Sequence, residues 1–168
     1  MSAIGNFLRP ASIAVVGAGE QPTSSGGAVL RNLQAAGFRG RIVPVNPRGG
    51  QMFGLRVAAS LEAMGTPVDL VAILVKPESI EAVVLQAAQT GHRHLLILPG
   101  GFAEAGAAGQ ARNARLQQLA QEHGITIGGP NCAGNINLLD AHNPFAATFF
   151  RAMPRGGGVA MISQSGAL

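Results

Sequence analysis

Apolar residues alternate along the chain between short β-branched runs and longer stretches with helical spacing. The short runs are bounded by glycine or proline, as is typical of strands buried in a parallel sheet; they cover residues 12–16, 41–45, 68–75, 94–98 and 125–127. The helical stretches lie between them, at residues 28–36, 78–90 and 110–122. Strands that alternate with helices in this way form right-handed crossovers. The pattern therefore predicts an α/β fold with a parallel sheet and helices on both of its faces.

The pattern changes after the last of these strands. Residues 128–134 are rich in turn formers, and residues 135–156 show no clean period, which favours a linker wrapped around the first domain. An apolar run at residues 159–162 then has the character of a new strand. We expect a Rossmann-like domain at residues 1–134, a linker at residues 135–156, and the first strand of a truncated second α/β domain at residues 157–168.

Composition limits the class of protein. Apolar residues make up 47% of the chain and charged residues 12%, with 24 glycines, as in a compact globular protein. The apolar runs are far shorter than the roughly 20 residues that cross a bilayer, and the N-terminus lacks the features of a signal peptide. Cys132 is the only cysteine, which excludes an intrachain disulfide. We expect a cytoplasmic protein that does not bind membranes.

The net charge of +4 is spread thinly along the chain. Lysine and arginine residues are scattered singly, without the basic clusters and interleaved aromatic residues of nucleic-acid-binding proteins. A mild positive balance suits a small polyanionic ligand. We expect such a ligand and no nucleic acid partner.

The loop after the first strand is the best placed for binding, since it leads into a helix N-terminus. Gly17, Ala18 and Gly19 begin like the dinucleotide-binding fingerprint, but Pro22 occupies the position of its third glycine. Three hydroxyl residues then precede Gly26, namely Thr23, Ser24 and Ser25. Their side chains can cap the following helix or donate to a phosphate oxygen, and both interpretations stay open.

The second strand ends in Asn46, Pro47 and Arg48. NAD-binding folds place an acidic residue here to hold the ribose hydroxyls. An arginine without a neighbouring acid disfavours NAD and suits a ligand with a phosphate on its ribose. NADP and coenzyme A (CoA) both meet this condition, while the alternative for Arg48 is an ordinary solvated side chain.

Two further loops follow strands at the same edge of the sheet. Lys76 and Pro77 come after the third strand, where the Lys76 amine either faces the crevice or points to water from a helix start. Gly101 and Phe102 come after the fourth strand. Glycine lets a ligand approach the backbone closely, and we expect Phe102 to form an apolar wall.

Cysteine and histidine residues show no catalytic or metal-binding pattern. Cys132 has no base that the sequence identifies beside it, which favours a packing role over a nucleophile. The four histidines lack the spacing of metal ligands. We expect neither a metal site nor a catalytic residue in this chain.

Motifs distributed over essentially the whole chain resemble a known family. In order they are LRPASIAVVGAG, RIVPVNP, VDLVAILVKP, GGFAE, GPNCAGNIN and VAMISQSGAL. In this order and spacing, the chain resembles the Rossmann-like CoA-binding domain of NDP-forming (ADP-forming) acyl-CoA synthetases and of the succinyl-CoA synthetase α-subunit. The resemblance implies CoA or acyl-CoA as cofactor. It also implies a parent acid–CoA ligase that converts acid, NTP and CoA to acyl-CoA, NDP and phosphate through a phosphohistidine.

The resemblance implies roles for the residues named above. Residues 17–26 and 46–48 are expected to hold the nucleotide end of CoA. The pantetheine arm is expected to lie along Val75, Lys76, Pro77, Gly101 and Phe102. Asn131 and Cys132 are expected near the meeting point of acyl phosphate and thiol. Ser163, Ser165 and Gly166 are expected to face the phosphohistidine at the start of the second domain.

The chain departs from the family in two places. The family's first loop often reads PxKxG, whereas this chain has PTSSG and so lacks that cationic phosphate contact. The family's phosphohistidine lies in a segment beyond Leu168, and no histidine here matches its context. We therefore expect this fragment to bind without turnover, with NTP and Mg bound elsewhere in the parent and the remaining ligase and grasp domains present in cis or in trans.

Two other functions stay open. One is a regulatory CoA or nucleotide sensor, of the kind fused to acetyltransferases. The other is an NADP-binding oxidoreductase domain, which Gly17, Gly19 and Arg48 favour.

Overall fold

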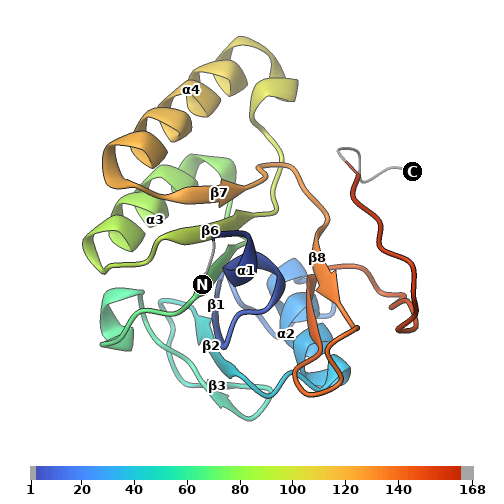
Figure 1. The fold of residues 1–168 in the computed structure, drawn as a ribbon. Coiled ribbons are helices and arrows are strands. Elements are labelled where there is room, and N and C mark those ends of the chain that lie inside the picture. The colour runs from blue at the N-terminus through green and yellow to red at the C-terminus, as the bar shows by residue number, and fades with distance from the viewer. Residues whose placement is uncertain (1–2, 164–168) are drawn as a thin grey trace.

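A parallel sheet forms the centre of the molecule (Figure 1). The structure is a computed structural model that describes residues 3–163. Five strands make up the sheet in the order β2-β1-β5-β6-β7: β1 (Ser12–Val16), β2 (Arg41–Val45), β5 (Leu70–Ile73), β6 (His94–Ile97) and β7 (Thr126–Gly128). All four neighbouring pairs are parallel. The predicted α/β fold is confirmed.

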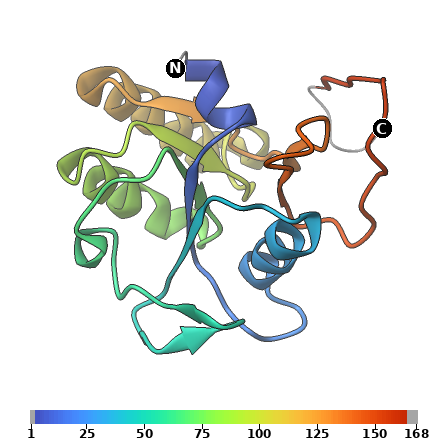
Figure 2. The same cartoon turned by 60° about the horizontal axis from the view of Figure 1, so that its bottom comes forward.

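Helices cover both faces of the sheet (Figure 2). α2 (Ser25–Ala36) packs on one face, while α3 (Pro77–Gln89) and α4 (Gly106–His123) pack on the other. Alternate side chains of β1 serve the two faces, since Ile13 lies in the core beneath α2 and Ala14 in the core beneath α3 and α4. No helix in residues 3–163 combines the length and the apolar character needed to cross a membrane.

The helices begin earlier than the apolar spacing predicts. α2 begins at Ser25 because the hydroxyl of Ser24 accepts a hydrogen bond from Gly27 N at 3.0 Å and caps the helix. α3 begins at Pro77, which needs no N–H partner in the first turn. α4 begins at Gly106, directly after the short 3₁₀ helix η2 (Ala103–Ala105).

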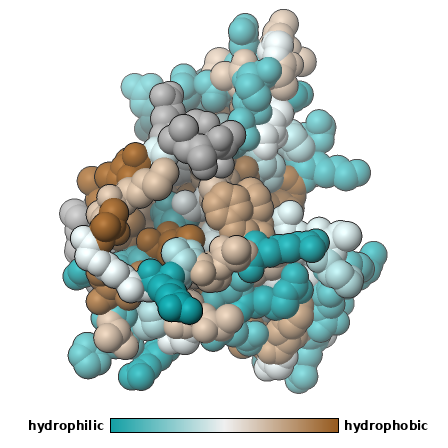
Figure 3. Space-filling model, turned by 90° about the vertical axis from the view of Figure 1, so that its right-hand side faces the viewer, coloured by the Kyte–Doolittle hydropathy of each residue, from teal (hydrophilic) through white to brown (hydrophobic). Residues whose placement is uncertain are grey.

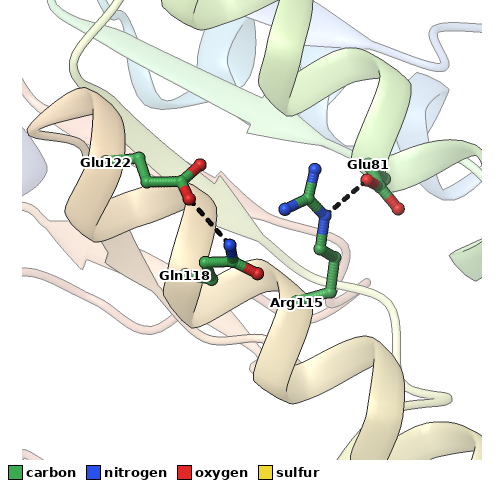
Figure 4. Close-up of polar contacts among 4 residues, drawn as sticks. All are labelled: Glu81, Arg115, Gln118 and Glu122. Atoms are coloured by element: carbon green, nitrogen blue, oxygen red, sulfur yellow. Dashed lines mark hydrogen bonds and ion pairs between the residues drawn. The ribbon is translucent and has the colours of Figure 1, made fainter.

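An exposed ion pair joins α3 to α4. Arg115 Nε donates to Glu81 Oε1 at 2.7 Å, and on α4 the amide of Gln118 donates to Glu122 Oε1 at 2.7 Å (Figure 4). Exposed pairs of this kind contribute little to stability because solvent screens the two charges. The two helices are therefore held mainly by their apolar faces.

Three elements were not predicted from the sequence. The short helix α1 (Ala3–Leu8) lies beside β6 and β8. The hairpin of β3 (Gln51–Met52) and β4 (Leu55–Arg56) follows β2 and is succeeded by the 3₁₀ helix η1 (Glu62–Met64). The third element is the antiparallel hairpin of β8 (Gly134–Asn137) and β9 (Phe145–Thr148).

Apart from Gly134, the β8–β9 hairpin lies within residues 135–156, the segment predicted as a linker. β9 packs on α2, and the ring of Phe145 is fully buried in the core. Residues 134–148 therefore contribute to the core of the first domain rather than merely wrapping around it. The division of the chain into domains stays a prediction.

The strand predicted at residues 159–162 is not formed. Val159 is 92% exposed and Ile162 102% exposed, and no strand pairs with this segment within the described part of the chain. A strand needs a neighbour to satisfy its backbone hydrogen bonds, so apolar character alone does not create one. Ser163, predicted to face the phosphohistidine, is exposed in this segment. Ser165 and Gly166, which carry the same prediction, lie outside the described residues.

Candidate functional site

The loops that follow the parallel strands gather at one edge of the molecule. In Figure 1, β6 and β7 run from left to right, so the carboxyl edge of the sheet is on the right. Figure 3 faces this side and shows apolar and polar groups interspersed on it. The loop after β1 leads to α2 on one face and the loop after β5 leads to α3 on the other. Such a switch point between neighbouring strands is where open α/β sheets bind ligands.

The loops after β1 and β5 touch at Gly17. This residue has φ 89°, in the left-handed region, and a methyl group added to it would lie 2.5 Å from the carbonyl oxygen of Leu74. Only glycine combines that backbone conformation with so close an approach. The switch point is therefore tightly packed at the start of the first loop.

The N-terminus of α2 is pressed against the first loop. A methyl group on Gly26 would overlap the carbonyl oxygen of Gly17, and one on Gly27 would overlap that of Gly19. Ser24 caps the helix, which is one of the two roles that the sequence left open for it. Thr23 and Ser25 are exposed beside this N-terminus. Their hydroxyls remain candidate phosphate donors.

Asn46 connects the loop after β2 to the loop after β1. Its Nδ2 donates to the carbonyl oxygen of Ala18 at 2.7 Å, and its Oδ1 accepts from Arg48 N at 2.9 Å. Pro47 and Arg48 are exposed next to this bridge. The three predicted residues therefore lie together with the first loop, although the Asn46 side chain is already engaged by protein atoms.

The loops after β5 and β6 also meet. Lys76 is exposed in an extended conformation ahead of α3, with Val75 half-buried before it. Gly101, with φ 97°, packs against Pro77, since a methyl group on it would lie 2.7 Å from Pro77 Cγ. The structure thus brings together these predicted residues of the third and fourth loops.

The prediction for Phe102 needs correction. Its ring is 2% exposed and belongs to the apolar core beneath α3 and α4, so it is not a wall facing a ligand. An aromatic ring at a helix start gains more free energy from burial than from solvent exposure. Only the backbone of Phe102 takes part in the loop at the carboxyl edge.

Two backbone hydrogen bonds join the loop after β7 to the end of β6 and the loop that follows it. Asn131 N donates to Pro99 O at 2.9 Å, and Cys132 N donates to Leu98 O at 3.3 Å. The Cys132 thiol donates to Ile97 O at 3.4 Å, and burial raises the pKa of this thiol. A protonated, partly buried thiol is a poor nucleophile, which agrees with the packing role predicted from the sequence.

Glu104 and Arg112 were missed by the sequence analysis. Glu104 Oε1 accepts from Gly101 N at 2.6 Å and from Phe102 N at 3.3 Å, while Arg112 Nε donates to Gly101 O at 2.9 Å. Backbone N–H groups, first that of Glu104 itself and then that of Gly101, hold the pKa of the Glu104 carboxyl below its usual value. An acid three residues after a glycine at a helix start is the sequence signal of this arrangement.

Known proteins resemble both the sequence and the fold. The chain is 35% identical over 167 residues to a trans-feruloyl-CoA synthase from an unknown prokaryotic organism, covering 98% of this chain and 24% of that relative. It is 33% identical over 162 residues to the alpha subunit of an ADP-forming acetate–CoA ligase II from Pyrococcus furiosus, covering 96% of this chain and 34% of that subunit.

A solved structure shows the same arrangement. The apo form of the dinucleotide forming acetyl-coenzyme A synthetase 1 of Ca. Korarchaeum cryptofilum superposes with a TM-score of 0.88 at 31% identity, covering 99% of this chain and 35% of that one. The chain thus spans about a quarter to a third of the length of these three relatives. None of the three is named as an oxidoreductase or an acetyltransferase, so those alternatives gain no support from them.

The match to a family model is consistent with these relatives. The model, described as a CoA binding domain, matches residues 11–137, which include all five parallel strands and the loops at their carboxyl ends. Because this match covers most of the chain, the chain belongs to the family of CoA-binding domains.

Proposed function

We propose that this chain binds CoA at the carboxyl edge of its sheet, as the CoA-binding part of an NDP-forming acyl-CoA synthetase. The observation that carries the proposal is the joining of the first two loops by Asn46, with Arg48 exposed beside them. An NAD site would need an acid in this place. An arginine instead suits the ribose phosphate of CoA.

The nucleotide end of CoA is assigned to the first two loops. Backbone N–H groups at the N-terminus of α2 attract phosphate, and the exposed hydroxyls of Thr23 and Ser25 stand next to them. Arg48 supplies a positive charge on the neighbouring loop. These groups replace the missing basic residue of the first loop.

The pantetheine arm is assigned to the third and fourth loops. Val75 and Pro77 offer apolar surface, Lys76 is exposed between them, and Gly101 packs against Pro77 on the neighbouring loop. The thiol end of CoA is assigned to the neighbourhood of Asn131 and Cys132, on the loop after β7. Ser163, Ser165 and Gly166 retain their proposed place facing a phosphohistidine of another domain.

The chemistry of the parent enzyme belongs to other parts of it. In that proposal acid, NTP and CoA become acyl-CoA, NDP and phosphate through a phosphohistidine that this chain does not supply. The remaining ligase and grasp domains, in cis or in trans, bind the acid and the NTP with Mg. This chain holds the cofactor and presents its thiol.

Calorimetric titration of the purified chain tests the proposal. We expect CoA to bind, dephospho-CoA to bind about tenfold more weakly because a charge-assisted contact is lost, and AMP to bind more weakly still. Arg48→Ala should abolish the difference between CoA and dephospho-CoA. Arg39→Ala, an exposed arginine that follows α2, is the matched control and should preserve it. Absence of CoA binding, or NADPH binding that CoA does not displace, contradicts the proposal.

A further inference from the structure

We infer that Glu104 and Arg112 are positioning residues, which hold three loops in the arrangement that receives the pantetheine arm of CoA. The inference rests on the proposed function. Neither residue belongs to the strand ends themselves, since Glu104 lies in η2 and Arg112 in α4. They act on the loop of residues 100–102 through its backbone.

Two oppositely charged side chains, those of Glu104 and Arg112, hydrogen-bond to the two backbone polar groups of Gly101. The Glu104 carboxylate accepts from its N–H at 2.6 Å, and the Arg112 guanidinium donates to its carbonyl oxygen at 2.9 Å. Glu104 Oε1 also accepts from Phe102 N at 3.3 Å. Hydrogen bonds to ionised groups are about twice as strong as those between neutral groups. The backbone of this loop is thereby fixed from both sides.

The hydrogen bonds of Glu104 and Arg112 to Gly101 also set the distance between the third and fourth loops. Gly101 has φ 97° and lies so close to Pro77 that a methyl group added to Gly101 would be 2.7 Å from Pro77 Cγ. Pro77 is the first residue of α3 and has a fixed backbone φ. A shift of Gly101 would therefore open or close the gap between the two loops assigned to pantetheine.

The same carboxylate lies where the loop after β7 meets the loop after β6. A methyl group on Gly100 would lie 2.8 Å from Glu104 Oε1 and 3.1 Å from Asn131 Oδ1. Asn131 is itself tied to this loop by the bond from its N–H to Pro99 O. Glu104 thus stands at the junction of the loops assigned to the pantetheine arm and the thiol end.

The nucleotide end depends on a different connection. The loops after β1 and β2 are joined by Asn46 through Ala18. Loss of the Glu104 hydrogen bonds should therefore weaken the binding of ligands that carry pantetheine. Binding of the nucleotide end by itself should stay unchanged. A merely structural role for Glu104 would weaken both together or neither.

The experiment compares CoA with adenosine 3′,5′-bisphosphate, which lacks pantetheine, by calorimetry on the same protein samples. Glu104→Ala should bind CoA about tenfold more weakly, as expected when the charge-assisted hydrogen bonds to Gly101 N and Phe102 N are lost. Its affinity for the bisphosphate should stay within about twofold of the original. Glu104→Gln keeps an acceptor oxygen without the charge and should fall between Glu104→Ala and the unchanged chain.

Glu122→Ala is the matched control. It removes the same charge from the far end of α4, where Glu122 Oε1 accepts a hydrogen bond from the Gln118 amide (Figure 4). Both of its affinities should remain unchanged. If Glu104→Ala does not fold, Glu104→Gln and Arg112→Lys allow the same comparison of CoA with the bisphosphate. Each of them weakens the hydrogen bond to one backbone polar group of Gly101.

Two results would overturn the inference while the proposed function stands. One is equal weakening of CoA and bisphosphate binding in the Glu104 variants. The other is CoA affinity that none of these variants changes. Failure of the unchanged chain to bind CoA is a separate result, and it overturns the proposed function together with this inference.

Discussion

The Asn46 side-chain amide donates to the carbonyl oxygen of Ala18 over 2.7 Å and so joins two loops that lie 28 positions apart in sequence. Its other polar atom, Oδ1, holds Arg48 N at 2.9 Å. One side chain thus sets both the spacing of the first two loops and the turn that carries Arg48. This makes Asn46 more important for the shape of the nucleotide end than for direct contact with a ligand.

Asn46→Asp should weaken the binding of CoA and of adenosine 3′,5′-bisphosphate by similar factors, about tenfold each. The carboxylate can still accept from Arg48 N, but it faces the Ala18 carbonyl oxygen with an acceptor instead of a donor. The unfolding free energy should fall by about 1–3 kcal/mol. Calorimetry and urea denaturation measure the two effects, with Asn113→Asp on α4 as control. Unchanged binding of both ligands would refute the role given to Asn46.

Gly27→Ala should destabilise the chain although it places alanine in a helix. Alanine normally favours a helix over glycine by up to about 1 kcal/mol, but here its methyl group would overlap the carbonyl oxygen of Gly19. We expect a net loss of about 1–3 kcal/mol on denaturation and weaker CoA binding. Gly157→Ala is the control, since nothing lies within 4 Å of the added methyl group. Equal stability of the two variants would show that α2 is not packed on the first loop.

The parallel sheet could be predicted from the sequence because its strands are buried on both faces. Ile13, Ala14 and Val15 are all fully buried, so the run that they form is apolar without interruption. Glycine and proline then mark where each strand stops. Since parallel strands end at one edge, the positions of the binding loops followed from the same pattern.

Elements that depend on distant contacts could not be predicted in this way. α1 has six residues, too few to be stable alone, and its last carbonyl groups are satisfied by β8: Asn135 Nδ2 donates to Phe7 O at 3.2 Å and Asn137 Nδ2 to Leu8 O at 2.9 Å. The helix and the hairpin therefore support each other, although 128 positions separate Phe7 from Asn135. Neither segment has a periodic apolar pattern of its own.

Within the site, positions were easier to predict than orientations. Gly17, Arg48, Lys76 and Gly101 all lie at the predicted edge. Phe102 occupies the predicted loop, but its ring turns into the core, because the loop's backbone conformation decides the direction of the side chain. Glu104 and Arg112 act on that backbone from η2 and α4, and nothing in a strand-end pattern indicates a contact of this kind.

Cys132 should be unreactive in the folded chain. Burial raises the pKa of its thiol, so little thiolate is present at neutral pH. We expect iodoacetamide to alkylate Cys132 at pH 7.5 at least about tenfold more slowly than in the urea-unfolded chain. Equally fast alkylation of the folded and unfolded chains would contradict the packing role.

His92 should make the stability of the chain depend on pH in mildly acidic solution. Its side chain is 1% exposed, its Nδ1 lies 2.8 Å from Thr90 Oγ1, and its Nε2 has no hydrogen-bond partner in the described part of the protein. Burial, and then the charges of Arg41 and Arg93, lower the pKa of His92 in the folded chain. The imidazole is therefore neutral when folded and gains a proton more readily when unfolded.

The direction of the pH effect follows from proton binding. Above the ordinary histidine pKa of about 6.5, neither state binds the proton and stability is unaffected. As the pH falls below that value, the unfolded chain takes up a proton that the folded chain does not, and stability is lost until the lower folded pKa is passed. The loss is about 1.4 kcal/mol for each tenfold difference in proton affinity between the two states. His92→Phe should remove this part of the pH dependence because phenylalanine does not titrate, whereas His142→Gln, at an exposed position, should keep it. Urea denaturation of the three proteins between pH 7.5 and pH 5 measures the effect, and parallel stability curves for His92→Phe and the unchanged chain would show that His92 is not its source.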